Sequence, residues 1–285
     1  MSAVPVLEVL APGAGVSIQD LGRRGWKRYG IPQGGAMDAD SARKANLLVG
    51  NEESAPVLEF LFTGARLLVL SAAEFAITGA EVDSDCPQWR NFSAQGGQKI
   101  TFGQLRAGVW TYLAVQGGFS SSRWFGSTSV DPRAGLGEIL PAGVRLNRES
   151  VRQSNQISSR FVPGLVRERF DRVPVIRIWP GPEWERFPAD VRALFLNEDW
   201  RVSRQSDRVG YRLEGTPLAF GSFRMLSAPV LVGTVQVPPN GLPIVLLRDG
   251  PTVGGYPRLG ILDPSEVSRF TQCAPGSPVR FQVVQ

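Results

Sequence analysis

Short apolar runs separated by glycine, proline and small polar residues dominate the pattern of this sequence, which is typical of β-rich proteins. Runs of this kind predict strands at 4–10, 57–62, 66–70, 74–78, 99–102, 110–115, 144–146 and 175–179. Two further runs, Val230–Val237 and Leu242–Leu247, are joined by Pro238-Pro239-Asn240-Gly241, and this turn chemistry predicts a hairpin. Because helical periodicity is rare, we expect a mainly β protein with a few short helices.

Helical periodicity is confined to three short stretches. The clearest begins at Asp38, the expected N-cap, has apolar residues at 42, 45, 48 and 49, and ends before Gly50. A second short helix is expected over Pro188–Leu196. The third is expected to begin at Asp263-Pro264-Ser265-Glu266, where an Asp cap, a proline and an acid have the spacing of a helix start.

A polar and basic stretch at residues 147–172 interrupts the pattern near the middle of the chain. Such a stretch is typical of a connector, so we expect an N-terminal lobe over 1–160 and a C-terminal lobe over 170–285. No apolar run approaches the roughly 20 residues that span a bilayer, and no signal peptide is visible. Cys86 and Cys273 offer no disulfide framework, so a cytoplasmic protein without membrane association is expected.

Charge and residue usage exclude several classes of function. The formal charge of +5 is spread over short, broken basic stretches, so no nucleic-acid partner is expected. The sequence has no histidine, which excludes a Ser-His-Asp or Cys-His group and any His-ligated metal within this chain, and no metal site is predicted. None of the three lysines has the Met-Lys-Met setting of biotin attachment, so any biotin would be carried by another chain.

The densest group of chemically useful residues lies between positions 205 and 212. Gln205, Asp207, Arg208 and Tyr211 bring an amide, an acid, a guanidinium and a phenol close together in sequence. Arginine can hold a carboxylate through two parallel hydrogen bonds, and a nearby acid or phenol can handle a proton. We therefore predict that Asp207, Arg208 and Tyr211 are catalytic and that Gln205 binds substrate. A surface Arg/Asp network beside a turn is the simpler interpretation of the same residues.

A second group of candidates lies on and after the predicted hairpin. Gly254 and Gly255 allow close approach of the backbone to a ligand, and their amides can stabilise developing negative charge. Gln236 is an amide within an apolar run, so it is either satisfied in the core or directed into a pocket. These three residues and Tyr256 are predicted to bind substrate, while a tight turn is the alternative explanation for the glycines.

The loop before the first helix contains five glycines between positions 22 and 35. A glycine-rich loop that enters a helix N-terminus can bind an anion, but this spacing matches no nucleotide-binding fingerprint, and a structural entry loop is the simpler interpretation. Asp20 and Arg24 are its candidates for substrate binding.

Longer motifs tie these segments together. The segments IQDLGRRGWKRYGIPQGGAMDADSARKANLLVGN, TYLAVQGGF, SRQSDRVGYRLEG and VQVPPNGLPIVLLRDGPTVGGYP follow the order found in the family called allophanate hydrolase subunit 2, or carboxyltransferase subdomains A and B. The resemblance covers roughly residues 4–283, and the chain is similar to stand-alone bacterial members known as the C component of 5-oxoprolinase. It implies two cyclophilin-like β-barrel lobes.

The resemblance also implies a multi-subunit enzyme that is inactive as this chain alone. Such members act with a subunit-1 partner (KipI-like, or PxpB-like) and a third, LamB/YcsF-like (PxpA-like) protein, and use ATP to open the lactam 5-oxoproline to glutamate. No P-loop is present, so the ATP site is expected on another protein of the complex. In this scheme Arg208 holds a carboxylate or lactam carbonyl, Asp207 or Tyr211 assists proton transfer, and Gly254 and Gly255 offer amides.

Two other functions are left open by the sequence. In fused relatives the same pair of modules is the carboxyltransferase of a biotin-dependent urea carboxylase, and nothing in this chain separates that substrate from a lactam. A non-enzymatic antagonist that binds a kinase-inhibitor protein is compatible with the same sequence. Prolyl isomerisation by a cyclophilin-like lobe would rest on fold analogy alone.

Overall fold

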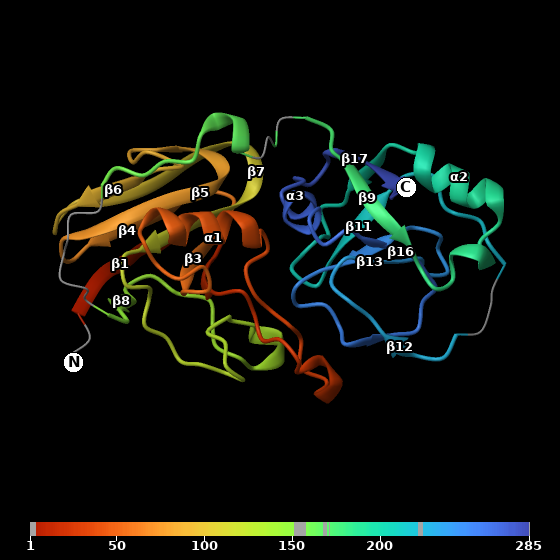
Figure 1. Ribbon diagram of the computed structural model, residues 1–285, viewed down its shortest axis with the longest axis horizontal. Coiled ribbons are helices and arrows are strands. Elements are labelled where there is room, and N and C mark those ends of the chain that lie inside the picture. The colour runs from red at the N-terminus through yellow and green to blue at the C-terminus, as the bar shows by residue number, and fades with distance from the viewer. Residues whose placement is uncertain (1–3, 151–157, 168–169, 171, 222–224, 285) are drawn as a thin grey trace. The chain divides into compact units, whose positions relative to one another are not determined.

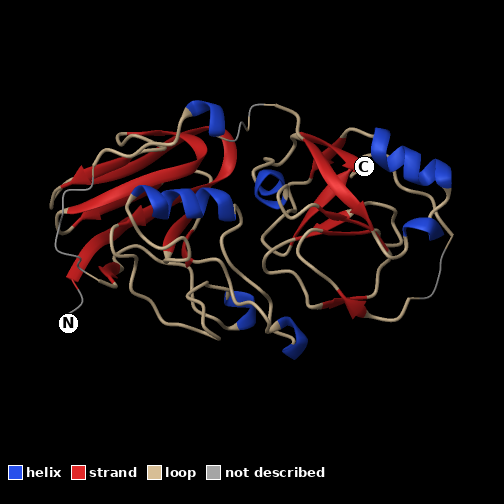
Figure 2. Cartoon of the chain, in the orientation of Figure 1, coloured by secondary structure: helices blue, strands red, loops and turns tan. Residues whose placement is uncertain are grey.

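Contacts divide the chain into two units in the computed structural model, which describes residues 4–150, 158–167, 170, 172–221 and 225–284 (Figure 1). Unit 1 comprises residues 1–23 and 34–169, and unit 2 comprises residues 24–33 and 170–285. Segment 24–33, which we call the strap, therefore belongs to unit 2. The prediction of lobes at 1–160 and 170–285 placed this segment in the N-terminal lobe. Strands predominate over helices in both units, as expected (Figure 2).

The described strands of unit 1 form one eight-stranded sheet, in the order β2-β3-β7-β4-β1-β8 with β5 and β6 joined through β7. Its elements are β1 (Val4–Pro12), β2 (Val16–Gln19), α1 (Ala39–Leu48), β3 (Val57–Leu61), β4 (Ala65–Val69), β5 (Ala73–Ser84), β6 (Asn91–Ala94), β7 (Lys99–Val115), the 3-10 helix η2 (Pro132–Ala134), β8 (Arg145–Arg148) and η3 (Gly164–Val166). No pairing closes this sheet among these strands, so the first lobe is a half-barrel.

The half-barrel depends on the length of β7. The sequence predicts two strands, at 99–102 and 110–115, and the structure joins them into one strand of 17 residues. The first residues of β7 pair with β4 and the last ones pair with β3, so a single strand connects two parts of the sheet. Gly108, with a φ of 87°, lies where the register with β5 shifts, and glycine adopts this conformation without steric cost.

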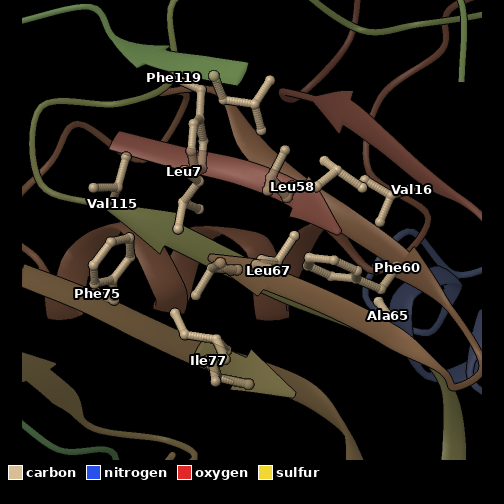
Figure 3. Close-up of a cluster of buried hydrophobic side chains, with 14 of the residues drawn as sticks. Leu7, Val16, Leu58, Phe60, Ala65, Leu67, Phe75, Ile77, Val115 and Phe119 are labelled. Atoms are coloured by element: carbon tan, nitrogen blue, oxygen red, sulfur yellow. The ribbon is translucent and has the colours of Figure 1, made fainter. Parts of the chain in front are cut away.

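Alternation along the strands gives the unit 1 sheet two buried faces. One carries a core of aliphatic and aromatic side chains, which includes Leu7, Val16, Leu58, Phe60, Leu67, Phe75, Ile77, Val115 and Phe119 (Figure 3). The other is covered by α1, which packs against β5 and β7. On that face Glu59 lies opposite Tyr112, and Tyr112 lies opposite Thr78. The row of polar groups runs under the start of the helix.

The predicted first helix is confirmed. Asp38 is the N-cap of α1, and its Oδ1 accepts a hydrogen bond from Ser41 N at 2.9 Å. Gly50, with a φ of 73°, follows the C-cap Val49 as predicted. Ala42 and Ala45 are buried, so the helix packs closely on the sheet.

Unit 2 contains a closed seven-stranded barrel, in the order β10-β11-β14-β13-β16-β9-β17, and a separate two-stranded ribbon of β12 and β15. Its elements are η1 (Lys27–Tyr29), β9 (Val175–Pro180), η4 (Trp184–Arg186), α2 (Ala189–Asn197), β10 (Trp200–Val202), β11 (Gly210–Glu214), β12 (Ala228–Pro229), β13 (Thr234–Gln236), β14 (Ile244–Leu246), β15 (Val253–Gly254), β16 (Arg258–Leu262), α3 (Val267–Thr271) and β17 (Pro278–Val283). The predicted hairpin is the pair β13–β14, with shorter strands than the apolar runs suggest.

The third helix begins later than the sequence predicts. The segment Asp263-Pro264-Ser265-Glu266 forms a turn, and α3 starts at Val267 with Glu266 as its N-cap residue. Asp263 Oδ1 accepts hydrogen bonds from Ser265 N at 3.0 Å and Ser265 Oγ at 2.6 Å, so its carboxylate stabilises the turn instead of capping the helix.

Candidate functional site

Arg208 lies at the end of the barrel where β11 begins and β14 has just ended. Its guanidinium binds Asp249 through two hydrogen bonds, Nε to Oδ2 at 2.6 Å and Nη2 to Oδ1 at 3.0 Å. The two side chains are 17% and 6% exposed, so the pair is nearly buried. The sequence predicts that Arg208 binds a ligand carboxylate in a bidentate manner; in the structure it makes this contact with the carboxylate of Asp249.

The neighbours of Arg208 also have structural contacts. Asp207 is exposed, and its Oδ1 accepts hydrogen bonds from Val209 N at 2.8 Å and Gly210 N at 3.3 Å, which closes the turn into β11. Gln205 is exposed, and its backbone N–H donates to Ser203 Oγ at 3.3 Å. The catalytic role of Asp207 and the binding role of Gln205 stay predictions.

Tyr211 points into the barrel. It is 4% exposed, and its ring packs on Phe270 with 5.5 Å between centroids. The hydroxyl donates to Thr271 O at 2.7 Å, which ties β11 to the end of α3. This placement follows from alternation in β11, where Tyr211 and Leu213 are buried on either side of the exposed Arg212. A catalytic role for its phenol stays a prediction.

The second group of candidates converges in space. Gln236, at the end of β13, is 4% exposed, and its Nε2 donates to Tyr256 O at 3.4 Å. A Cβ on Gly254 would clash with that same nitrogen, so the missing side chain leaves room for the amide. Among the described residues, no group accepts a hydrogen bond from the backbone N–H of Gly255 or Tyr256. An amide side chain and two backbone donors therefore lie together at one end of the barrel.

An ion pair that the sequence did not single out supports this group. Glu183 Oε2 accepts hydrogen bonds from the backbone N–H and Nε of Arg258, at 3.0 and 2.8 Å, and Oε1 accepts from Nη2 at 2.7 Å. Arg258 Nη1 donates to Pro229 O at 3.2 Å. Arg258 thus joins the loop before η4, the start of β16 and the ribbon that carries Gly254. A Cβ at position 181 would clash with Arg258 O, which explains the glycine there.

The structure does not bring the two candidate groups together. Gln236 pairs with Ile244 at the start of β14, whereas Arg208 precedes Gly210, which pairs with Leu246 at the end of β14. The two groups therefore lie at opposite ends of the same ladder.

Asp20 is a buried structural carboxylate of unit 1. Its two oxygens accept hydrogen bonds from Gly22 N at 2.7 Å, Ser127 Oγ at 2.6 Å, Thr128 N at 2.7 Å, Thr128 Oγ1 at 3.2 Å and Ser129 Oγ at 2.5 Å. Burial favours a raised pKa for Asp20, but these hydrogen bonds outweigh burial, so the pKa is lowered from its ordinary value. The carboxylate thereby fastens the glycine-rich loop to segment 127–129.

Arg24 belongs to the strap and therefore to unit 2, while Asp20 belongs to unit 1. The Arg24 side chain is exposed. Substrate binding by these two residues stays a prediction.

The N–H groups at the end of the glycine-rich loop and the start of α1 bind side chains of the protein instead of a bound anion. Glu59 Oε2 accepts hydrogen bonds from Met37 N at 2.7 Å and from Tyr112 Oη at 2.8 Å, and Tyr112 Oη in turn accepts from Asp38 N at 2.7 Å. Asp38 itself caps the helix. Burial and the nearby charge of Glu59 raise the pKa of Tyr112 well above its ordinary value. These donors are used internally, which favours the structural interpretation of the loop over a phosphate site.

Metal and thiol chemistry find little support in the described parts of the chain. No group of three or more Cys, Asp or Glu residues there is arranged to hold a metal ion. Cys86 and Cys273 are free, and burial raises the pKa of each thiol to about 12. A thiol with such a pKa is almost entirely protonated at neutral pH, so neither is an activated nucleophile.

Within the residues that the structure describes, no helix has the length and apolar character needed to cross a membrane.

Comparison with known proteins agrees with this architecture. The model of the family "Carboxyltransferase domain, subdomain A and B" matches residues 29–283. The C component of 5-oxoprolinase from Escherichia coli (strain K12) is 34% identical over 97% of this chain and 90% of its own length.

Solved structures extend the likeness to the fold. The Kluyveromyces lactis urea carboxylase superposes on 100% of this chain with a TM-score of 0.90 and 26% identity, and the chain spans 28% of that enzyme. A second crystallised relative has a TM-score of 0.90 and 33% identity over 99% of this chain, which spans 56% of its length. The chain therefore belongs to the carboxyltransferase subdomain A and B family.

Proposed function

We propose that this chain is one component of an ATP-dependent 5-oxoprolinase, which opens the lactam 5-oxoproline to glutamate. The observation that carries the proposal is the 34% identity to the C component of the E. coli 5-oxoprolinase over 97% of this chain and 90% of the relative. A match of this extent leaves no large domain of the relative without a counterpart. The chemistry of unit 2 is compatible with an amide or lactam substrate.

The group around Gln236 and Gly254 fits the polar atoms of a lactam. A lactam has one carbonyl acceptor and one N–H donor on adjacent atoms. The backbone amides of Gly255 and Tyr256 can donate to the carbonyl oxygen and to the negative charge that develops on it when a nucleophile adds to the carbonyl carbon, before the C–N bond breaks. The Gln236 amide, which lies against Gly254, can accept from the lactam N–H through its Oε1. We propose that these residues orient substrate.

Positioning is the role we propose for the group at the other end of the barrel. Arg208 holds Asp249, and Asp207 closes the turn into β11, so they fix the loop before β11 and the loop after β14. A direct grip on a substrate carboxylate would require Arg208 to exchange Asp249 for that ligand. An Arg208→Lys variant keeps the charge and loses the two-pronged geometry, so it should weaken the fold of these loops before it changes substrate affinity.

Partner proteins complete the proposed enzyme. We expect a KipI-like subunit-1 protein and a LamB/YcsF-like protein to supply the rest of the active site and the ATP site. Biotin is not attached to this chain, because Lys27, Lys44 and Lys99 lack the setting of a carrier lysine. The cytoplasmic location expected from the sequence stays a prediction.

Reconstitution tests the proposal directly. ATP-dependent formation of glutamate from 5-oxoproline would be measured with the two proposed partner proteins, with this chain added or omitted. We expect turnover only with all three chains. Equal turnover with and without this chain would contradict the proposal. Gln236→Ala should lower turnover strongly without loss of complex formation. Gln282→Ala, a matched change at an exposed position in β17, is the control.

A biotin-dependent carboxyltransferase is the second candidate. The observation in its favour is the TM-score of 0.90 with the K. lactis urea carboxylase over the whole chain. It is supported less well, because identity is 26% and the chain spans 28% of that enzyme. Transfer of a carboxyl group from carboxybiotin to urea by the binary complex of this chain with its subunit-1 partner would favour this candidate over the first.

A further inference from the structure

A polar cavity of unit 1 lies outside the candidate groups described above. It has a volume of about 380 Å³, which is sufficient for a small organic molecule. Its wall is formed by residues of β5 and β7, by the segment that joins β5 to β6, and by Arg167 at the end of η3. The charged side chains on this wall are Glu81, Asp83, Arg106 and Arg167, so their formal charges cancel.

Two of these four charged groups pair with each other, and two do not. Arg106 Nε lies 2.6 Å from Asp83 Oδ1. Among the described residues, no hydrogen bond or ion pair engages the carboxylate of Glu81, and none engages Nη1 or Nη2 of Arg167. Glu81 and Arg167 therefore line one cavity without contact between their charged groups. One anion and one cation of the wall are available to a ligand.

A chain of hydrogen bonds fastens Arg167 to the sheet. Its Nε donates to Val162 O at 2.8 Å, and Val162 N donates to Trp89 O at 2.8 Å. Trp89 N in turn donates to Ile77 O of β5 at 2.7 Å. These bonds fix the half-buried guanidinium of Arg167 at the cavity and leave the donors of Nη1 and Nη2 for a ligand. Such a planar pair of donors matches the two oxygens of a carboxylate.

The backbone around the cavity departs from a regular sheet. The register between β5 and β7 shifts three times between Gly79 and Ser84. Irregularities of this kind redirect single side chains and are over-represented next to active sites. Trp89, a buried residue of the wall, has a φ of 61°, which is uncommon for a bulky side chain and clusters at ligand sites. Glu81 and Trp89 thus occupy positions that regular strand geometry would not give them.

We propose that this cavity of unit 1 binds a small free α-amino acid, whose carboxylate lies against Arg167 and whose ammonium group lies against Glu81. The ligand carries one charge of each sign, which matches the two charged groups that have no partner in the wall. A simple anion would meet the carboxylates of Glu81 and Asp83, and a simple cation would meet two arginines, so the wall disfavours both. The inference concerns binding by unit 1 and does not depend on the proposed enzymatic activity.

Titration of the full chain tests the inference. The probes are free glycine, alanine, serine and glutamine, and binding of each would be followed by saturation-transfer NMR of the ligand at neutral pH. We expect saturable binding of at least one of them. The N-acetyl derivative of that amino acid lacks the positive charge and its α-carboxamide lacks the negative charge, so each should bind at least tenfold more weakly. No saturable binding of any probe, or less than tenfold weaker binding of either derivative, would overturn the proposal.

Two variants locate the two charges. Arg167→Gln should weaken binding of the amino acid at least tenfold and leave binding of its α-carboxamide unchanged, because that ligand has no carboxylate to hold. Glu81→Gln should weaken binding of the amino acid equally and leave the N-acetyl derivative unchanged. Arg66→Gln and Glu52→Gln remove the same charges from exposed positions of unit 1 and are the matched controls.

A variant that binds like its control would show that the site is wrong. Circular dichroism establishes that each variant is folded. Because Glu81 is exposed, Glu81→Gln should fold, and its result decides the inference if Arg167→Gln does not fold.

Discussion

The Glu183–Arg258 pair determines how firmly unit 2 holds its candidate site. Arg258 makes three hydrogen bonds to one carboxylate, and the Arg258 and Glu183 side chains are only 18% and 9% exposed. Glu183→Gln keeps the volume and leaves a buried guanidinium without its counter-charge. Removal of one partner from a buried pair costs roughly 3–5 kcal/mol. Because Arg258 keeps its bond to Pro229 O, we expect the lower value, about 3 kcal/mol.

Local hydrogen exchange is the appropriate assay, since a protein with two units need not unfold in one step. Amides of β16 should exchange faster in Glu183→Gln by the factor that corresponds to the lost free energy, while amides of β3 and β7 in unit 1 should not change. Glu185→Gln is the control, because Glu185 lies two residues away, is 81% exposed and pairs with Arg192 in solvent. Such a surface pair contributes at most about 1 kcal/mol. Equal effects of the two variants would refute the reasoning.

The same pair predicts a dependence on pH. Hydrogen bonds from Arg258 lower the pKa of Glu183, against the opposing effect of burial. A folded-state pKa below the unfolded value of about 4.3 means that the stabilisation is complete above that pH and is lost as the pH falls through the folded value. The difference between wild type and Glu183→Gln should therefore be full at neutral pH and shrink in acid. A difference that is constant down to strongly acidic pH would contradict this.

Three further variants test other parts of the structure. Asp20→Asn replaces a carboxylate oxygen by a donor that faces other donors, so we expect a loss of about 3 kcal/mol in the free energy of unfolding, measured by urea denaturation; a loss below about 1 kcal/mol would contradict the description of that cluster. Tyr211→Phe should cost about 1 kcal/mol through the lost hydrogen bond to Thr271 O, whereas lost turnover at unchanged stability would support the catalytic prediction. Gly254→Ala should displace the Gln236 amide, so turnover of the reconstituted enzyme should fall while the melting temperature changes little, and unchanged turnover would argue against this site.

Sequence patterns predicted the helix boundaries correctly where residues adjacent in sequence determine them. The cap at Asp38 and the glycine at position 50 bound the first helix because both act through adjacent backbone groups. The start of the third helix was wrong because Asp263, which has the spacing of a cap, turned its carboxylate to Ser265. The same residue types serve a helix cap and an Asx turn, and only tertiary packing selects between them.

The candidate site was predictable in part. Gln236 stood out because an amide in an apolar run must be satisfied or functional, and Gly254 stood out because a glycine permits close approach; the structure brings the two together. Glu183 and Arg258 were missed because 75 residues separate them, and each is an ordinary charged residue in its own segment. Arg208 looked available for a ligand because nothing local reveals Asp249 as its partner, 41 residues away.

The strap has a consequence for folding of the protein during its synthesis on the ribosome. Lys27 is separated by 203 positions from Val230, whose carbonyl it binds. At about 5–20 residues per second, the strap leaves the ribosome about 10–40 s before its partner has been synthesised. Throughout that interval Lys27 lacks the carbonyl that accepts its hydrogen bond in the native structure. During synthesis, the hydrogen bond between the strap and Val230 can therefore form only after most of the chain has been made.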